Sequence, residues 1–460
     1  RAVREQLAEL HRVGGAYGRA LVHARALHEE APADPVAAHR VGQLLTMAGE
    51  HEDARDVLTT AQRLAIATGE PTIVAEVEAQ LAELHYQRAD YDEAARWGAR
   101  ALDAAEAAGA RVIAISARNT LGKLALAQKD PASAASLFEQ NRVQASAAGL
   151  GHQEAQAHTN RAVALLLQRD LRGAEDACHT AIEVASRVCD TRERAIATEN
   201  LAVIAHLGRD YGNALNYYHQ AVTLLKRLGN RAMLARVANN LGELYLTLGD
   251  RHRARALCEF ARRVGGKLPG SVLGESLLLL GRIDAADGNV ASARDSFRTA
   301  RETFARLGSQ RDVEATVELA RMALYDGDVA AARALLVGLE RELPGKYRAD
   351  LALVQADLER AAGGNTRAAA ARAVELAREC DDPERLLPAL LRHARALGDA
   401  GEIGLATRVL ERAQRVEADL TSRVPDESMG AWQERALRIE LQRVAAALTT
   451  AWTQTRHQSD

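Results

Sequence analysis

The stretch ARVANNLGELYLTLGDRHRARA, residues 235–256, decides the fold because its pattern returns along most of the chain. A Gly-Asp break at Asp250 separates one apolar run from a second run that contains Ala254. The equivalent break residues lie 40 positions apart as far as Asp250 and slightly closer afterwards; they are Glu50, Asp90, Asp130, Asp170, Asp210, Asp250, Asn289, Asp328, Asn365 and Glu402. A fixed period of this length indicates an internal structural repeat.

Small residues occupy two further places in each repeat. An alanine follows every break residue by four positions: Ala54, Ala94, Ala134, Ala174, Ala214, Ala254, Ala293, Ala332, Ala369 and Ala406. A glycine or alanine precedes most breaks by eight positions: Gly42, Ala82, Gly122, Ala162, Ala202, Gly242, Gly281, Ala320 and Ala394. Small residues facing each other let two helix backbones approach, and a short polar turn permits an antiparallel pair. Each repeat is therefore predicted to be one αα-hairpin.

Composition supports an all-α chain and narrows the classes of partner. Hydrophobic residues make up 47% and aromatic residues only 3%, so the apolar mass consists largely of the helix formers alanine and leucine. The net charge of −3 argues against direct nucleic-acid binding, and no apolar run approaches the length of a membrane span. The four cysteines show no CxxC spacing. We therefore expect a cytoplasmic protein without disulfides.

The small-residue pattern resembles the tetratricopeptide repeat family over the chain as far as Val424. The 40-residue units are similar to the extended kinesin-light-chain type and to the repeat arrays of bacterial signalling proteins and transcription regulators, in which NNLG opens a unit. The resemblance implies an all-α solenoid, a right-handed superhelix of about eleven αα-hairpins. The units are expected to start near residues 1, 35, 75, 115, 155, 195, 235, 274, 313, 350 and 387.

Two places depart from the pattern. Asp357 stands where the tenth unit should have a small residue, and a buried carboxylate there would be costly, so we expect the register to slip to Ala356. The periodicity stops after the array, residues 1–424. Residues 425–452 are expected to form one capping helix, because a solenoid must cover its last apolar face, and residues 453–460 a flexible tail.

No catalytic motif is found in the sequence. The patterns HExxH, GxSxG, Gly-Lys-Ser/Thr and paired cysteine ligands are missing, and the Gly-Lys of NTLGKLA, residues 119–125, falls at the small-residue position inside a helix. We therefore expect no enzymatic activity, no catalytic residues, no metal and no cofactor.

The candidate binding surface is one face of the first helix of each unit. Residues 14, 10, 7 and 3 positions before a break share a helical face, and in a solenoid of this type that face lines the concave side. It carries an asparagine ladder and apolar neighbours: Asn160, Asn200, Asn240, Val163, Leu167, Val203 and Leu207. Charged residues extend the face: Lys123, Arg236, Glu243, Arg282 and Arg321.

An amide can both donate to and accept from the backbone of an extended peptide, and the resemblance implies peptide binding by asparagines so placed. The alternative is that the asparagines tie neighbouring hairpins together, and the sequence leaves both open. The position one residue earlier holds Asn119, Thr159, Glu199 and Asn239. The lysine-based carboxylate clamp of the chaperone-binding subclass is therefore not expected.

The functional expectation is a protein- or peptide-binding module. We expect it to be the sensory or regulatory arm of a bacterial cytoplasmic signalling protein whose effector domain lies outside this segment, which begins at Arg1 instead of methionine. The partner would be a separate protein or peptide, or another domain of the same polypeptide. A stand-alone adaptor or oligomerisation scaffold is the alternative, and an unrecognised enzyme is less favoured. The sequence does not indicate the oligomeric state.

Overall fold

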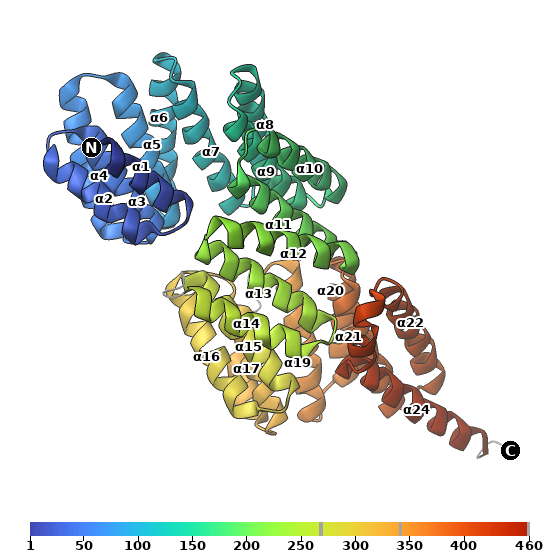
Figure 1. The fold of residues 1–460 in the computed structure, drawn as a ribbon. Helices are drawn as coiled ribbons and strands as arrows, with labels where there is room; N and C mark the ends of the chain where they lie inside the picture. Colours follow the sequence, from blue (N-terminus) through green and yellow to red (C-terminus); the bar gives the residue numbers. More distant parts are fainter. Residues whose placement is uncertain (266–269, 340–342, 458–460) are drawn as a thin grey trace. The chain divides into compact units, whose positions relative to one another are not determined.

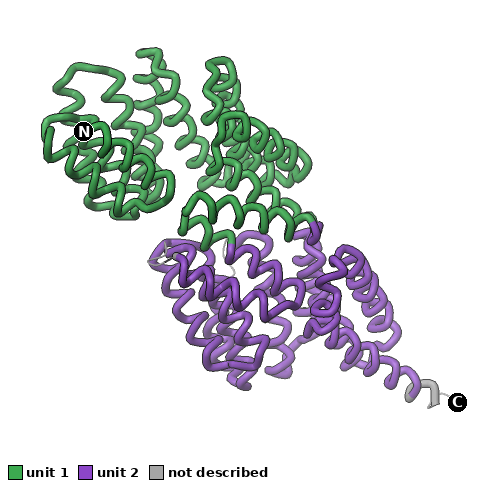
Figure 2. The backbone as a smooth tube through the Cα atoms, viewed as in Figure 1, with its two compact units in different colours: residues 1–208, 213–237 green, residues 209–212, 238–460 purple. Residues whose placement is uncertain are grey.

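A computed structural model of the chain describes residues 1–265, 270–339 and 343–457. In these residues the regular structure is helical and no strand occurs, which confirms the all-α prediction (Figure 1). Two compact units are distinguished (Figure 2): unit 1 comprises residues 1–208 and 213–237, and unit 2 comprises residues 209–212 and 238–460. The division passes through α12 (Tyr211–Leu228) and α13 (Arg231–Thr247).

Unit 1 is built from successive antiparallel helix pairs. Its helices, besides its shares of α12 and α13, are α1 (Ala2–Val13), α2 (Tyr17–Glu30), α3 (Pro35–Ala48), α4 (His51–Thr68), α5 (Pro71–Gln87), α6 (Tyr91–Ala107), α7 (Arg111–Ala127), α8 (Pro131–Ala147), α9 (Gly151–Leu167), α10 (Leu171–Arg187) and α11 (Thr191–Leu207). From α1 to α11 each helix packs against the next, and α3, α5, α7, α9 and α11 also contact one another in that order. The first helices of the hairpins therefore form one continuous layer.

Unit 2 repeats this arrangement and ends in the C-terminal segment. Its helices are α14 (Arg251–Gly265), α15 (Gly270–Ala286), α16 (Val290–Arg306), α17 (Asp312–Tyr325), α18 (Val329–Leu336), α19 (Gly345–Ala361), α20 (Thr366–Glu379), α21 (Pro383–Asp399), α22 (Ile403–Thr421), α23 (Met429–Gln433) and α24 (Ala436–His457), with the 3-10 helix η1 (Asp426–Ser428). Here α15, α17, α19 and α21 form the corresponding layer. Along the described residues, α1 to α22 make up the eleven expected pairs.

The break residues set where the second helices begin. Asp130 accepts a hydrogen bond from the Ser133 amide (3.0 Å), and Asp170 accepts one from the Gly173 amide (2.9 Å), so both act as N-caps. The residue before the break has a left-handed backbone, which ends the first helix, in every unit except the tenth, where Gly363 takes this conformation two residues before Asn365. Gly249 supplies this conformation readily at φ 91°, whereas Lys129 adopts it at φ 63° despite its side chain.

The small residues are closely packed as the repeat predicts: a Cβ atom added to Gly242 would lie 3.3 Å from the Ala254 carbonyl, whereas three other glycines have a different partner. Nine of the ten alanines after the breaks have no exposed surface, and Ala369 is the exception. A Cβ atom added to Gly122 would lie 2.5 Å from the Phe138 ring. The glycine therefore faces the large residue eight positions after the break, and not the alanine four positions after it. Gly42 and Gly281 meet Leu58 and Phe297 in the same way.

The tenth unit shows the expected slip of register. Ala356 is buried against Ala370 and Ala396, whereas Asp357 is partly exposed and pairs with Arg392 at 2.7 Å. The neighbouring alanine also shifts by one position, because Ala370 replaces Ala369 in the core. A carboxylate is thus kept out of the helix–helix contact.

The C-terminal segment forms η1, α23 and α24 instead of the single helix expected over residues 425–452, and α24 runs to His457. The last helix packs against α21 and α22. Trp432 is fully buried, donates to the Thr421 hydroxyl at 2.9 Å and lies against the Tyr211 ring at a centroid distance of 6.2 Å. The segment therefore contacts both the last hairpin and the first residue of α12.

Candidate functional site

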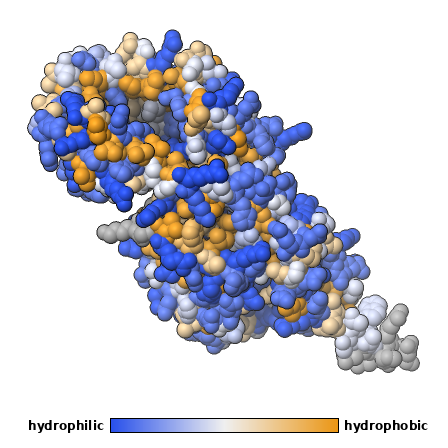
Figure 3. All heavy atoms as spheres, in the orientation of Figure 1, coloured by the Kyte–Doolittle hydropathy of each residue, from blue (hydrophilic) through white to orange (hydrophobic). Residues whose placement is uncertain are grey.

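Most of the candidate binding surface, called the groove below, lies on α9 and α11, which are the first helices of two neighbouring hairpins in unit 1. They contact each other directly, and each presents an asparagine, a valine and a leucine at equivalent positions. Leu167 is 56% exposed and Leu207 is 52% exposed, while Val163 and Val203 are half-buried. Hydrophobic residues also gather in patches between hydrophilic ones on the face of the molecule shown in Figure 3. Helices α9 and α11 thus share a surface with apolar side chains available for contact.

Asn160 ties its hairpin to the preceding one. Its Nδ2 donates a hydrogen bond to Oδ1 of Asn119 on α7 at 2.6 Å, and the residue is half-buried. Helices α7 and α9 belong to successive hairpins and pack against each other. For this residue the geometry matches the stack-stabilising alternative.

Asn200 has a different environment. Its Nδ2 is buried and has no hydrogen-bond partner among the described residues. The position equivalent to Asn119 is occupied here by Thr159, whose shorter side chain donates to the Ala155 carbonyl at 3.0 Å. A buried amide donor without a partner is unfavourable by about 1–3 kcal/mol. The ladder is therefore not uniform, since Nδ2 of Asn160 donates a hydrogen bond to the preceding hairpin and Nδ2 of Asn200 makes none among the described residues.

The expected basic residues of unit 1 are already paired. Lys123 forms an ion pair with Glu83 and lies over the Tyr86 ring at 5.0 Å. Burial acts to raise the pKa of Glu83, but the Lys123 ammonium outweighs it and the pKa is lowered. Arg236 pairs with the buried Glu199 at 2.6 Å. Both cations are largely neutralised within the protein.

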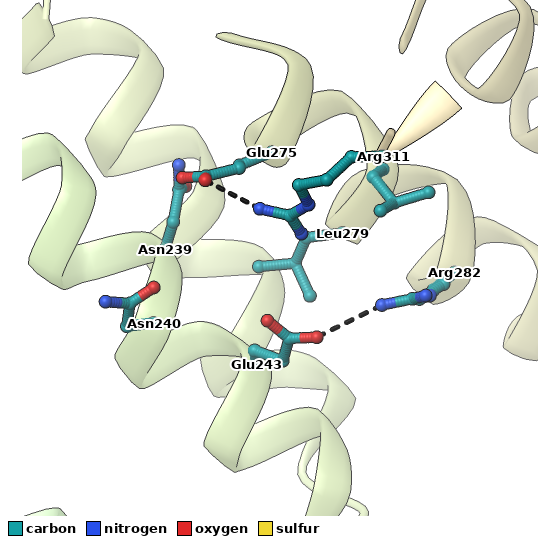
Figure 4. A pocket seen from close by; sticks show the side chains of 8 residues that line it. Asn239, Asn240, Glu243, Glu275, Leu279, Arg282 and Arg311 are labelled. Carbon is teal, nitrogen blue, oxygen red and sulfur yellow. Dashed lines mark hydrogen bonds and ion pairs between the residues drawn. The ribbon is translucent and has the colours of Figure 1, made fainter. Parts of the chain in front are cut away.

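The remaining expected residues belong to unit 2, where they form a charged network (Figure 4). Arg282 lies 3.1 Å from Glu243, 3.3 Å from Glu314 and 3.1 Å from Glu318. Arg321 pairs with Glu318 at 3.2 Å. One guanidinium is thus surrounded by three carboxylates from α13 and α17.

The charges of this network hold one another ionised. Burial alone would lower the pKa of Arg282, but Glu318, Glu243 and Glu314 outweigh burial and raise it. Burial likewise acts to raise the pKa of Glu318, yet Arg321 and Arg282 keep it below its usual value. Arg282 and Glu318 therefore both stay charged near neutral pH.

A small cavity beside the network leaves little room for a ligand. It measures about 10 Å³ and is lined by Asn240 together with Glu243, Glu275, Arg282 and Arg311. Figure 4 shows Arg311 directed at Glu275, to which it is bound at 2.6 Å. A space of this size holds about one water molecule. Asn240 therefore lies beside charged side chains in unit 2 that leave almost no space for a ligand.

Sequence reasoning missed a larger cavity in unit 1. It measures about 540 Å³ and is lined by residues of α1, α9, α11 and the end of α12, among them the buried Glu193. The sequence gives a misleading signal here, because Asp190 and Glu193 have the spacing of a helix capping box. Asp190 does cap α11 through the Glu193 amide at 2.9 Å, but the Glu193 side chain lies inside, near Thr159.

The paired helices define the class of protein as an α-solenoid. Residues 193–264 match the sequence model of the family described as Tetratricopeptide repeat. The chain therefore contains tetratricopeptide repeats, as the small-residue pattern predicts, and such repeats form protein-binding modules. No curated protein sequence matches the chain. No helix of the described residues has the length and apolar character needed to cross a membrane.

Solved structures of similar fold are related only distantly in sequence. A Rap protein complexed with Competence and Sporulation Factor is 15% identical, with 82% of this chain and 99% of that chain covered and a TM-score of 0.46. A signal transduction ATPase (STAND) with a tetratricopeptide repeat sensor from Pyrococcus horikoshii is 14% identical, with 81% and 55% covered and a TM-score of 0.49. The quorum sensor NprR from B. thuringiensis in its apo form is 13% identical, with 80% and 94% covered and a TM-score of 0.44.

Proposed function

We propose that unit 1 binds an extended protein segment along α9 and α11. The observation that carries the proposal is the buried Nδ2 of Asn200, which has no partner among the described residues, on a surface that exposes Leu167 and Leu207. A peptide carbonyl would accept the hydrogen bond that the amide lacks. The two leucines would then lose contact with water against an apolar side chain, at about 25 cal/mol for each Å² buried.

The proposal divides the expected residues by role. Contact with the partner is assigned to Asn200, Val163, Leu167, Val203 and Leu207. A supporting role inside the array is assigned to the other expected residues, because they contact neighbouring repeats or their own helix or, for Asn240, line the small charged cavity; they are Asn160, Asn240, Lys123, Arg236, Glu243, Arg282 and Arg321.

The test compares substitutions at the two asparagines. The ligands are peptides selected from a random phage-displayed library by binding to the purified chain. Isothermal titration should show that Asn200→Ala weakens binding by about two- to tenfold, the equivalent of one neutral hydrogen bond of about 0.5–1.5 kcal/mol. Asn160→Ala is the matched control and should change affinity little while lowering the melting temperature. Unchanged affinity in Asn200→Ala, with the fold intact, would contradict the proposal.

We further propose that binding in this groove serves a regulatory arm of a bacterial cytoplasmic signalling protein. The reading frame upstream of Arg1 tests this role. A nucleotide-binding loop or a kinase catalytic loop encoded there would support a regulatory arm. A start codon directly upstream would favour a stand-alone adaptor or scaffold instead.

A further inference from the structure

The larger cavity of unit 1 has a buried acidic wall. Glu193 is only 4% exposed, and it lines the cavity of about 540 Å³ together with Glu9 and Arg12 of α1 and His152 and Gln156 of α9. These residues come from the first, fifth and sixth hairpins. The cavity is therefore a feature of the folded unit and not of any single repeat.

Glu193 differs from the other buried glutamates of this unit by lacking a cation. Glu78 pairs with Arg100 at 2.5 Å, and Glu199 pairs with Arg236 at 2.6 Å. No described lysine, arginine or histidine forms an ion pair with Glu193. Its neighbour is the Thr159 hydroxyl, which also lies within reach of the Ala155 carbonyl and can donate to only one of them.

The cations that line the cavity are engaged elsewhere or exposed. Arg12 makes two hydrogen bonds to Glu9, at 2.7 and 2.5 Å. His152 lies 2.8 Å from Asp190. Arg192 also lines the cavity, is exposed, and acts on Glu193 only through space. Glu193 is thus the acidic group whose charge is least compensated on this wall.

We propose that the cavity binds a cationic group of the partner segment, an ammonium or guanidinium, against Glu193. This inference rests on the proposed function and extends it, because Gln156 belongs to the cavity wall and lies one helical turn before Asn160 on α9. A segment that follows the α9 surface beyond Asn160 reaches the cavity next. A basic side chain or an amino terminus at that point enters it.

Charge and burial explain why the cavity would bind a cationic group at Glu193. A buried carboxylate without a cation is unfavourable, and an arriving cation supplies the partner that Arg100 and Arg236 supply to the other two glutamates. Burial also raises the pKa of Glu193, with the Thr159 hydroxyl and Arg192 acting in the opposite direction. A bound cation would lower that pKa and favour the ionised form.

Cys189 allows a direct test without a known ligand. It is exposed and lines the same cavity, whereas Cys178 and Cys258 are buried, with thiol pKa values raised by burial to about 12 and about 11. A Cys380→Ser background removes the remaining partly exposed thiol. Three disulfides serve as probes: cationic cystamine, neutral bis(2-hydroxyethyl) disulfide and anionic 3,3′-dithiodipropionate. Each transfers one half to the Cys189 thiolate and releases the other half as a thiol.

The readout is the fraction of Cys189 labelled at equilibrium against 2-mercaptoethanol, measured by mass spectrometry. Cystamine should label several-fold more than the neutral probe, and Glu193→Gln should abolish that preference. Glu183→Gln, on the exposed side of α10, changes the net charge equally and should leave the preference intact. An unchanged preference in Glu193→Gln, or a preference for the anionic probe, would overturn the proposal. Because this assay needs no peptide, its failure is separable from failure of the Asn200 experiment.

Discussion

The phenolic hydroxyl of Tyr211 donates a hydrogen bond of 2.8 Å to Glu384, which lies 173 residues later in the chain. Glu384 also accepts from Arg435 at 2.7 Å, and Arg435 lies over the Trp432 ring at 3.9 Å. All four residues belong to unit 2. In a simple solenoid each repeat contacts only its neighbours. The Tyr211–Glu384 bond is a contact between distant repeats of unit 2. It makes the unfolding of this unit more cooperative than it would be with nearest-neighbour packing alone.

Removing this hydroxyl should destabilise unit 2. Tyr211 is 1% exposed, so Tyr211→Phe keeps the buried ring but removes one of the donors to the partly buried Glu384 carboxylate. We expect a loss of about 1–3 kcal/mol in urea unfolding. Tyr325→Phe is the control, because Tyr325 is 72% exposed, and should shift stability by less than about 0.5 kcal/mol. Equal effects of both changes would show that the contact contributes nothing.

A single methyl group should have opposite effects at two helical glycines. Gly122→Ala places a Cβ 2.5 Å from the Phe138 ring and should destabilise the chain by about 1–3 kcal/mol through overpacking. Gly18→Ala meets no atom within 4 Å and should stabilise α2 by about 0.5–1 kcal/mol. Thermal unfolding of both variants checks the prediction. A stabilising Gly122→Ala would mean that the two helices are not closely packed there.

The hydrogen bond between Asn160 and Asn119 should appear as a coupling energy in stability. We expect Asn160→Ala and Asn119→Ala each to lower the free energy of unfolding, with a coupling of about 0.5–1.5 kcal/mol in the double-mutant cycle. The cycle Asn200→Ala with Asn119→Ala should give no coupling. Additive effects in the first cycle would refute the tie between these hairpins.

Removing Arg282 should be costly because three carboxylates lose their shared partner. Arg282→Met is expected to destabilise unit 2 near the lower end of about 3–5 kcal/mol, since the Glu243 side chain is 46% exposed and partly solvated. Arg415→Met, at an exposed arginine without a described ion pair, is the control and should change stability by less than about 0.5 kcal/mol. Chemical denaturation of the two variants distinguishes a structural network from a dispensable one.

Glu193 should give a measurable pH dependence. Because the folded-state pKa is raised, the folded chain binds the proton more tightly than the unfolded chain, so this group's contribution to stability falls as pH rises from the ordinary value of 4.5 through the raised pKa. Glu193→Gln lacks this loss. Its melting temperature relative to wild type should therefore increase between acidic and neutral pH. A pH-independent difference would mean that the carboxyl titrates as it does in water.

The repeat could be predicted from sequence because its determinants are local. The glycine or alanine before most breaks and the alanine after each break recur at a fixed distance, and both report on contacts within one hairpin. The partner of Gly122 could not be assigned in this way, since a period places a small residue without saying which large side chain covers it. Phe138 fills that space.

The binding surface could be predicted only in outline. The period places Asn160 and Asn200 at equivalent positions, but their different hydrogen bonding follows from Asn119 in one preceding hairpin and Thr159 in the other. The cavity beside Glu193 could not be predicted, because α1 and α11, which line it, belong to the first and the sixth hairpin. A repeat period indicates contacts within a hairpin and between adjacent hairpins. It carries no information on contacts between hairpins that are far apart in the sequence.

The fit between Gly122 and Phe138 lies inside one hairpin, whereas the bond between Asn160 and Asn119 joins two. Tandem duplication of a whole hairpin would copy the glycine together with the side chain that fills its space, so the new unit would already be packed. At its two junctions with the adjacent hairpins, the polar side chains would face residues that do not match them. These polar contacts would have to be restored by later substitutions. An array of this kind can therefore lengthen by copying units, while each insertion creates new polar surfaces on which different partners can be selected.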